Sequence, residues 1–483
     1  MTPVGTPYEI VVGLEVHSRL LTKSKLFCGD STLFGGDPNT HISPITLAHP
    51  GTLPKMNRKA VEFAVKMGLA CGCNIAKENY FARKNYFYPD LPKGYQVSQH
   101  TTPICEGGFI HVTTSTGEKH IRLNRIHMEE DAGRSQHDSD DPWTMVDYNR
   151  AGTALIEIVT EPDIRSAEEA FACLTEIRKR VRYLGIGDGN MEEGSLRCDA
   201  NISVRKKGDP KLGTKVEIKN LNSISNVKRA VETESARLIE MLENGQTIKQ
   251  ETRSFDASTG TSFPTREKED ADDYRYFAEP DLTPFHLTEN FIEDIRAALP
   301  AMPEQRVRLY QEKFMLPAYD AAVISEEIEQ ADYFEAIAAI SPYYKSAANW
   351  IMGPVRSWLN DGGHDFSEFP LTPETMASLI KMVEEKAISF TTASGKLFPA
   401  LLENPAADPA ALAIASNWLQ ESDAGLLETL VDQVLNKFPD KVKEYQKGKK
   451  GLLSLFTGEV MKLSKGKADP VKTNEILLEK LKS

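Results

Sequence analysis

The sequence predicts an α+β fold in which an antiparallel-sheet domain is followed by an all-helical domain and a small helical tail. Apolar and polar residues alternate along 196–204 and again along 216–219, which is the period of half-buried strands. From residue 303 onward the apolar period becomes 3.6, as in amphipathic helices. The segment 404–409, NPAADP, is expected to be a linker before the tail.

The elements follow in chain order. A strand is expected at 8–17, and two runs around a Gly-Asp-Pro loop predict an antiparallel hairpin over 196–219. Helices are expected near 57–69, 165–184, 227–243, 326–340, 342–359, 372–386, 426–435, 452–463 and 471–481. Thr372 followed by Pro373 is a strong helix start. We therefore expect domains at 1–295, 296–405 and 406–483.

Composition restricts the classes of protein that the chain can belong to. With 483 residues, 40% of them hydrophobic, and a mean hydropathy of −0.38, the chain is expected to be soluble and globular. No apolar run approaches the roughly 20 residues that span a bilayer. Six cysteines in a chain of this length do not make a disulfide scaffold, and the N-terminus does not resemble a signal peptide. A cytoplasmic setting is expected.

Charge is unevenly distributed. The net charge is −13, which argues against a simple nucleic-acid coat. Residues 437–483 contain 12 Lys and 6 Asp or Glu, so this tail carries +6 and the remainder −19. Such a tail suits contact with a polyanion, and it equally suits solvated lysine-rich helices.

The predicted hairpin has an unusual polar face. Its side chains are Arg197, Asp199, Asn201, Glu217 and Lys219. Asn and Asp are disfavoured in the middle of strands, so their presence favours a binding site. A plain solvated hairpin is the alternative.

Three further stretches place carboxylates near a histidine. Glu15 and His17 share one strand face, about 6.5–7 Å apart. The stretch 127–134, HMEEDAGR, crowds three acids together, and Glu157 is the one charge in an apolar run. Several carboxylates with one imidazole suit Mg²⁺ or Mn²⁺ better than Zn²⁺. The alternative is that these groups face solvent or a sheet edge.

Other chemistry is missing or ambiguous. The sequence has no P-loop, no strand-to-helix G-x-G-x-x-G, no G-x-S-x-G elbow and no convincing nucleophile for amide hydrolysis. The loop 82–96 mixes cations with aromatics, which suits nucleotide stacking or simple packing. The segment 250–280 has four long cations for phosphate binding or for pairing with local acids: Arg253, Arg266, Lys268 and Arg275.

Taken together, these stretches resemble the GatB family, the B-type subunits of the bacterial aspartyl/glutamyl-tRNA amidotransferases. The resemblance runs in order through nearly the whole chain and weakens in the helical part. The stretches that carry it are GLEVH (13–17), RKNYFYPDLPKGYQ (83–96), HMEEDAGR (127–134), NRAGTALIEIVTEPDIRS (149–166), MEEGSLRCDANIS (191–203), EIKNLNSISNVKRA (217–230), QETRSFD (250–256), DDYRYFAEPDL (272–282) and KGKADP (465–470).

The resemblance implies a fold and a reaction. It implies a catalytic cradle similar to glutamine synthetase. The side-chain carboxylate of misacylated Glu-tRNA(Gln) or Asp-tRNA(Asn) would be phosphorylated by ATP with Mg²⁺ and then amidated. Ammonia would come through a tunnel from a partner glutaminase (amidase), which forms a heterotrimer with this chain and a third, small protein. The helical domain and the basic tail would hold the tRNA through its phosphates.

The resemblance also implies residue roles. His17, Glu130 and Glu157 match the family's metal ligands, with Glu15 beside them. Lys84 and Lys93 match lysines near the ammonia exit, where a Lys–Glu gate would operate and Glu130 would also keep ammonia neutral. For ATP contacts we expect the hairpin face and the four cations of 250–280.

One departure from the family concerns zinc. Many members carry C-x-C and C-P-x-C pairs, whereas this chain has Cys28-Gly29-Asp30 and Ser43-Pro44-Ile45-Thr46. One cysteine of four cannot make a tetrahedral thiolate site, so no zinc is expected.

Two rival functions remain. A stand-alone metal-dependent kinase or ligase acting on a small acid would keep the carboxylate site and would not need the basic tail. A non-catalytic tRNA-binding scaffold of the same complex would keep the tail and would not need Glu15, His17, Glu130 and Glu157 together.

Overall fold

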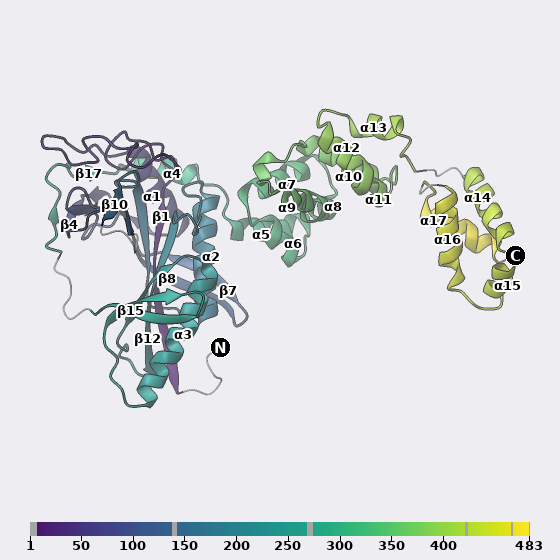
Figure 1. The fold of residues 1–483 in the computed structure, drawn as a ribbon. Helices are drawn as coiled ribbons and strands as arrows, with labels where there is room; N and C mark the ends of the chain where they lie inside the picture. The colour runs from purple at the N-terminus through teal and green to yellow at the C-terminus, as the bar shows by residue number, and fades with distance from the viewer. Residues whose placement is uncertain (1–6, 138–142, 268–273, 421–423, 465–466, 483) are drawn as a thin grey trace. The chain divides into compact units, whose positions relative to one another are not determined.

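The structure of the protein is a computed structural model. Its main element is a large sheet in the N-terminal part of the chain (Figure 1). The structure describes residues 7–137, 143–267, 274–420, 424–464 and 467–482. Contacts divide the chain into two compact units, Met1–Met302 and Pro303–Ser483. The predicted antiparallel-sheet domain followed by a helical region is confirmed.

Ten strands form the main path of the sheet in the first unit. Their order is β15 (Thr261–Glu267), β14 (Glu251–Asp256), β13 (Val216–Leu221), β12 (Leu196–Lys206), β1 (Tyr8–Arg19), β11 (Ala154–Thr160), β8 (Gly117–Glu130), β5 (Tyr95–Ser98), β4 (Ala82–Asn85) and β16 (Phe277–Ala278). Neighbours along this path pair antiparallel, except that β13 and β14 are parallel. The predicted hairpin is therefore confirmed as β12 and β13.

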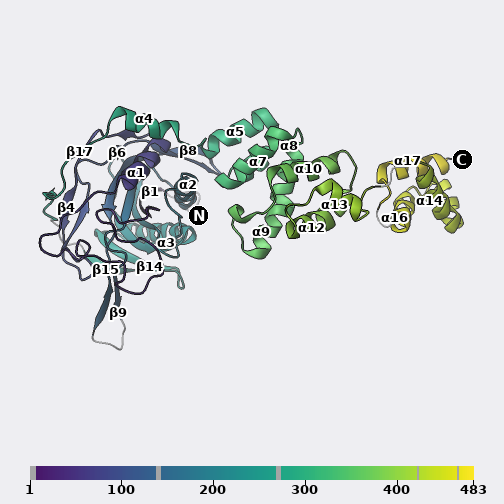
Figure 2. The ribbon, with the colours of Figure 1, turned by 90° about the horizontal axis from the view of Figure 1, so that it is seen from above.

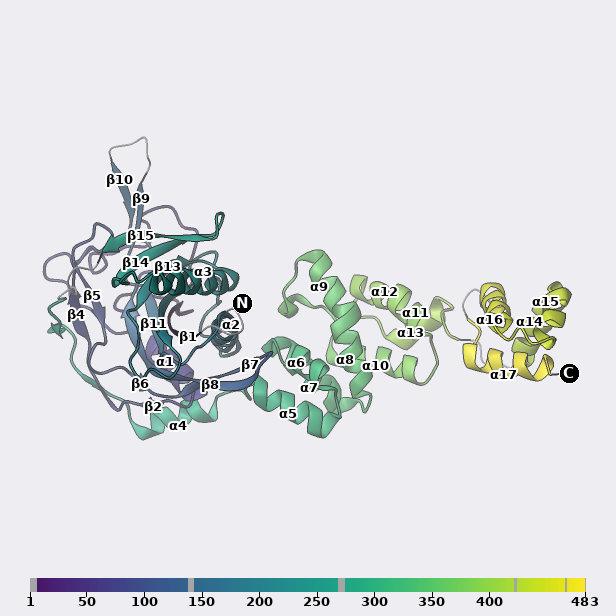
Figure 3. The ribbon, with the colours of Figure 1, turned by 90° about the horizontal axis from the view of Figure 1, so that it is seen from below.

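Shorter strands branch from this path. β2 (Asn74–Ile75), β6 (Cys105–Glu106) and β7 (Phe109–Thr114) extend the sheet around β8. β3 (Glu78–Asn79) pairs with β17 (Phe285–His286). β9 (Arg134–His137) and β10 (Thr144–Asp147) form a separate ribbon that stands out from the first unit (Figure 3).

Helices cover one face of the sheet. α1 (Arg58–Ala70), α2 (Ala167–Tyr183) and α3 (Ile224–Glu243) contact its strands, and α4 (Glu289–Ala297) contacts α1. On β1 the core side is apolar, with Val12, Leu14 and Val16 almost fully buried. Because successive side chains on a strand point to opposite faces, the residues between them form the polar face of the sheet. The functional candidates are gathered on this polar face.

The second unit is entirely helical in its described part (Figure 2). Its elements are α5 (Pro303–Phe314), α6 (Ala318–Ile324), α7 (Ile328–Ile340), α8 (Tyr344–Trp350), the π-helix η1 (Ile351–Val355), α9 (Arg356–Gly362), the 3₁₀ turn η2 (Phe366–Glu368), α10 (Pro373–Glu384), α11 (Phe390–Thr392), the π-helix η3 (Ala393–Leu397), α12 (Phe398–Glu403), α13 (Pro409–Ala415), α14 (Ala424–Lys437), α15 (Pro439–Gln446), α16 (Leu452–Leu463) and α17 (Pro470–Lys480). The helix expected over 342–359 is interrupted at η1, where Pro354 has no N–H for the normal ladder.

Three separate hydrophobic clusters occur among the residues that the structure describes. Their buried members lie within 8–295, 310–413 and 427–481. The expected boundaries near 295 and 405 stay a prediction, and separate clusters are what three domains would require. None of the helices in the described ranges is long and apolar enough to cross a membrane.

Candidate metal centre

A row of four side chains crosses the polar face of the sheet on four adjacent strands. Arg197 on β12 lies opposite His17 on β1, His17 lies opposite Glu157 on β11, and Glu157 lies opposite His127 on β8. Cross-strand partners share a face and lie close enough to interact. The strand register therefore places Glu157 between two imidazoles.

Glu129 completes a cluster of possible metal ligands with this row. His17 Nε2 lies 3.4 Å from Glu129 Oε1 and 3.2 Å from Glu157 Oε2. One ligand atom from each of the three residues can be chosen so that all lie within 4.8 Å of one another. An imidazole and two carboxylates that converge in this way fit a hard divalent cation such as Mg²⁺ or Mn²⁺.

The pKa values of His17, Glu129 and Glu157 indicate which group balances the negative charge of the two carboxylates when no metal ion is bound. Burial opposes protonation of His17, but its hydrogen bond to Glu157 and the charges of Glu129 and Glu157 outweigh burial and raise its pKa to about 9. Burial raises the pKa of Glu129 to about 7. Burial alone would also raise the pKa of Glu157, but His127 and His17 hold that pKa below its usual range. Protonated His17 thus supplies the positive charge between Glu129 and Glu157 that a bound cation would otherwise supply.

Glu130, the next residue after Glu129, points away from this cluster. Lys93 Nζ donates to Glu130 Oε2 at 2.6 Å, and the backbone N–H of Val97 donates to Oε1 at 2.8 Å. Glu130 is 2% exposed, so Lys93 compensates an almost fully buried charge. The structure therefore brings Glu129, and not Glu130, to His17 and Glu157.

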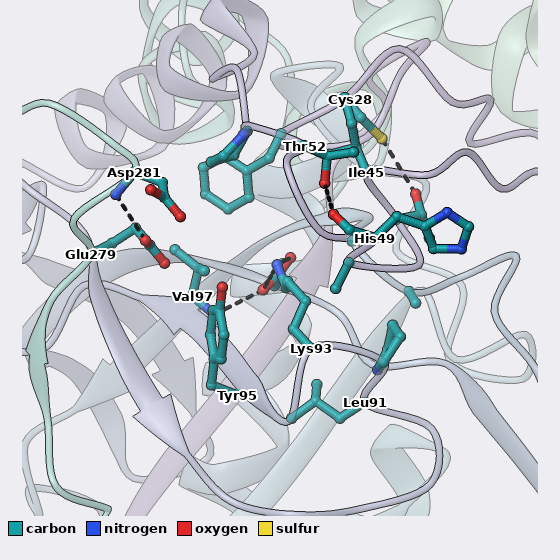
Figure 4. A pocket seen from close by; sticks show the side chains of 18 of the residues that line it. Cys28, Ile45, His49, Thr52, Leu91, Lys93, Tyr95, Val97, Glu279 and Asp281 are labelled. Carbon is teal, nitrogen blue, oxygen red and sulfur yellow. Dashed lines mark hydrogen bonds and ion pairs between the residues drawn. The ribbon is translucent and has the colours of Figure 1, made fainter.

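The Lys93–Glu130 pair lies in the wall of a cavity of about 230 Å³ (Figure 4). Apolar side chains such as Phe27, Leu91 and Val97 line much of it. Glu279 and Asp281 form another part of the wall, and both contact Arg83. This is a mostly enclosed space whose polar groups include one buried Lys–Glu pair.

Lys84 and Lys93 lie in different places, although the family resemblance implies one role for both. Arg83, beside Lys84 on β4, faces Glu279 at the cavity. Lys84 faces the other way, 4.9 Å from the ring centre of Tyr274, and its charge acts on Glu129. Lys84 therefore belongs to the metal-centre side and Lys93 to the cavity.

The hairpin face is a second polar network on the same side of the sheet. Asn201 Nδ2 donates to Glu15 Oε1 at 3.0 Å. Lys219 Nζ lies 3.1 Å from Asp199 Oδ2 and 3.2 Å from Glu217 Oε1. Burial and the charges of Glu157, Glu217 and Asp199 raise the pKa of Glu15. The structure thus brings Glu15 and four of the predicted hairpin residues together beside the metal centre.

Arg197 joins the metal centre to the cavity. Its Nη2 donates to Asp131 Oδ1 at 2.9 Å, and Asp131 is one of the residues that line the cavity. Arg150 also contacts Asp131, with its Nε 3.4 Å from Oδ2. The sequence marks Asp131 only as a member of an acidic stretch, so this bridging position is a finding of the structure.

Arg253, one of the four predicted cations of 250–280, does not lie on the polar face. Arg253 lies opposite Ile218, which is buried in the core, and pairs with Glu251 and Glu234 on that side. The backbone of Arg266 lies opposite Thr252. Lys268 lies outside the described residues, and Arg275 is exposed with a positive φ of 46°. Arg253 therefore has a structural role in the helix-covered side of the sheet.

The residues at the family's cysteine positions form a hydrogen-bonded cluster. Cys28 Sγ lies 3.4 Å from Thr46 Oγ1, and Thr46 donates to Asp30. Lys25, which is fully buried, donates to the backbone oxygen of Tyr148 at 3.2 Å. Burial raises the pKa of the Cys28 thiol, whereas zinc requires a thiolate. The expected lack of zinc stays a prediction, and this cluster gives it a physical basis.

Fold and site together define the class of the protein: a sheet enzyme domain with a carboxylate–imidazole centre, followed by a helical region. A family model for the GatB/GatE catalytic domain matches residues 10–293, and one for the GatB domain matches residues 332–481. The chain belongs to the GatB family.

Full-length relatives agree with these family matches. The chain is 48% identical over 478 residues to the B subunit of the aspartyl/glutamyl-tRNA(Asn/Gln) amidotransferase of Geotalea uraniireducens, covering 98% of this chain and 99% of the relative. It is 49% identical to the protein of the same name from Chlorobium phaeobacteroides and 45% identical to that from Thermodesulfovibrio yellowstonii, with the same coverage. The resemblance stated from the sequence is confirmed.

Proposed function

We propose that this chain is the component of a tRNA-dependent amidotransferase that activates and amidates the side-chain carboxylate of Glu-tRNA(Gln) or Asp-tRNA(Asn). It would act in the cytoplasm, in a heterotrimer with a glutaminase and a third, small protein. ATP would be the phosphoryl donor, so the reaction would be an ATP-dependent carbon–nitrogen ligation with glutamine as the nitrogen source.

The observation that carries this proposal is the divergence of two consecutive glutamates. Glu129 lies within 3.4 Å of His17 in the candidate metal centre, and Glu130 pairs with Lys93 in the cavity wall. Amidation of a carboxylate needs an activating site and a source of unprotonated ammonia within reach of each other. The positions of Glu129 and Glu130 at the end of strand β8 support this proposal, because they reach two neighbouring sites that suit these two tasks.

On the metal side, His17, Glu129 and Glu157 would hold Mg²⁺. When bound, the ion would neutralise the triphosphate and help align it with the attacking carboxylate. Arg197 lies opposite His17, and Lys219 lies in the hairpin network on the same face, so we assign these two cations to the phosphates of ATP. Asp199, Asn201, Glu217 and Glu15 would orient these cations.

On the cavity side, Glu130 would take a proton from ammonium. Ammonium would bind beside the Glu130 carboxylate. Transfer of one proton from the ammonium nitrogen to the carboxylate oxygen would leave neutral ammonia with a free electron pair for attack. Lys93 would hold the Glu130 carboxylate in place until ammonium arrives. The cavity would then be the last part of the ammonia route from the glutaminase.

The remaining parts of the chain would bind tRNA. The first unit would be a cradle similar in fold to glutamine synthetase, residues 296–405 a helical tRNA-binding domain, and residues 406–483 a basic domain for the tRNA elbow. The charge of +6 over residues 437–483 supports phosphate contact, because phosphate binding dominates nucleic-acid affinity.

The test is ATP-dependent acyl-phosphate and amide formation on Glu-tRNA(Gln) by the reconstituted complex. Glu129→Ala and His17→Ala should bind tRNA normally and form neither product. Glu130→Ala should still form acyl phosphate and lose most amide formation. Amide formation that survives all three changes would place the chemistry elsewhere, and tRNA binding without ATP turnover in the wild type would favour the scaffold function.

A further inference from the structure

His127 is a second imidazole at the candidate metal centre. It is 4% exposed, and its Nε2 lies 3.5 Å from Glu157 Oε2 and 3.9 Å from Glu129 Oε2. It flanks Glu157 on β8, while His17 flanks the same residue on β1. Adjacent strands are about 4.8 Å apart, so the two imidazoles approach the carboxylate from opposite sides.

Arg125 determines which ring nitrogen of His127 carries the proton. Arg125 Nε lies 3.4 Å from His127 Nδ1 and is a donor in this contact. A guanidinium can only donate, so Nδ1 must accept. A neutral imidazole has one N–H, which is then on Nε2 and faces the two carboxylates. A protonated Nε2 has no free electron pair for a metal ion.

We infer that His127 is a positioning residue of the metal centre: its Nε2–H, which faces Glu157 Oε2 at 3.5 Å, donates to that carboxylate when the metal is bound, and His127 is not itself a ligand. This inference rests on the proposed function, because it takes His17, Glu129 and Glu157 as the ligands. Partners behind the ligands commonly orient them, and their loss typically costs about 10–100-fold in metal affinity.

The contacts of Glu157 explain why a second donor is needed. Its Oε2 is shared by His17 at 3.2 Å and His127 at 3.5 Å. When His17 directs the electron pair of Nε2 toward a cation, it can no longer donate to that oxygen. His127 is then the imidazole that still donates to Glu157, and it keeps the carboxylate in one orientation.

The experiment measures Mn²⁺ binding to the full chain in its complex, by the electron paramagnetic resonance signal of free Mn²⁺. His127→Phe keeps the ring volume and removes the donor, so the dissociation constant should rise about 10–100-fold. His127→Gln retains an N–H donor and should recover most of this loss. Met128→Leu is the matched control, because Met128 is the next residue and faces the hydrophobic core.

Nitrogen couplings of bound Mn²⁺ give a second readout that does not depend on any variant. The wild type should show one coordinated imidazole, from His17. Two coordinated imidazoles would overturn the inference by making His127 a ligand, and so would wild-type affinity in His127→Phe. If His127→Phe does not fold, the wild-type couplings and His127→Gln still decide.

The outcomes also separate this inference from the proposed function. A wild type that binds no Mn²⁺ at this centre, with Glu157→Gln indistinguishable from it, would defeat both. A wild type that binds Mn²⁺, loses it in Glu157→Gln and keeps it in His127→Phe would defeat only the role of His127.

Discussion

Glu129 and Glu130 are joined by one peptide bond, yet their surroundings differ in charge and in chemistry. Glu129 faces an imidazole and a second carboxylate, which together favour a divalent cation. Glu130 faces a lysine in the wall of a cavity, so its carboxylate is paired with a single positive charge. Two acids next to each other therefore need not share a function, because successive side chains of a strand point to opposite faces of the sheet.

The strongest way to test this difference is to neutralise each acid in turn. Glu129→Gln should weaken Mn²⁺ binding by at least about 100-fold, since even loss of a partner behind a ligand costs about 10–100-fold. Glu130→Gln should leave Mn²⁺ affinity within a few-fold of wild type. Calorimetric titration of both variants checks this, and equal losses would show that the two acids act on one site.

The second prediction concerns the cavity side. Lys93→Met leaves the nearly buried Glu130 without its cation and should lower the free energy of unfolding by about 3–5 kcal/mol. The double variant Lys93→Met/Glu130→Gln should recover most of that loss, because no charge is then left uncompensated. Urea unfolding of the four proteins of this cycle is the measurement. Additive effects in the double variant would contradict a coupled pair.

The third prediction is a pH dependence of the metal-free centre. The pKa of His17 in the folded state is raised to about 9. Its stabilising contribution is therefore complete below the unfolded pKa of about 6.5 and is lost as the pH rises through about 9. The free energy of unfolding in a chelator should fall by up to about 3 kcal/mol over this range.

His17→Gln is the control for this titration. Its unfolding free energy should fall less over the same pH range, since the imidazole that gains the proton is absent and only the raised pKa of Glu129 still contributes. Saturating Mn²⁺ should reverse the trend in the wild type, because the cation competes with the His17 proton. A wild-type profile that matches His17→Gln would contradict the raised pKa.

The smallest expected effect distinguishes the two faces of the sheet. Arg253→Met should lower the free energy of unfolding by about 2–3 kcal/mol, because Glu234 and Glu251 lose a buried partner. It should leave the KM for ATP unchanged. Lys219→Met is the counterpart: Lys219 is 44% exposed, so stability should change by less than about 1 kcal/mol while the KM rises. A raised KM for ATP in Arg253→Met and an unchanged KM in Lys219→Met would show that ATP binds on the Arg253 side of the sheet.

Strand periodicity predicts much of the sheet, and when it is extended to residues 126–130 it also separates the two adjacent acids. The alternation along 196–204 places Arg197, Asp199 and Asn201 on one face, as the structure has them. Glu129 and Glu130 look alike in sequence, and the family resemblance leads to Glu130. The alternation of Ile126 and Met128 with His127 would have assigned Glu129 to the polar face.

The alternation of faces along a strand also assigns Arg253 on β14. Thr252 and Ser254 lie opposite Glu217 and Lys219, whereas Arg253 shares the side of Phe255 and the core. A long cation in an irregular-looking segment suggests phosphate binding, but the parity of its neighbours indicates the other face. The register between distant strands, such as β8 with β11, depends on tertiary pairing and cannot be read from the sequence.

The bulge in β8 has a consequence for how this chain can vary in length. Val159 pairs with Arg125 and Thr160 with Leu123, so Asn124 is an extra residue that the sheet accommodates. Between Arg125 and Glu130 the pairing with β11 is continuous. One residue inserted or deleted there would send each glutamate to the other's side. Insertions and deletions should therefore be strongly selected against between Arg125 and Glu130.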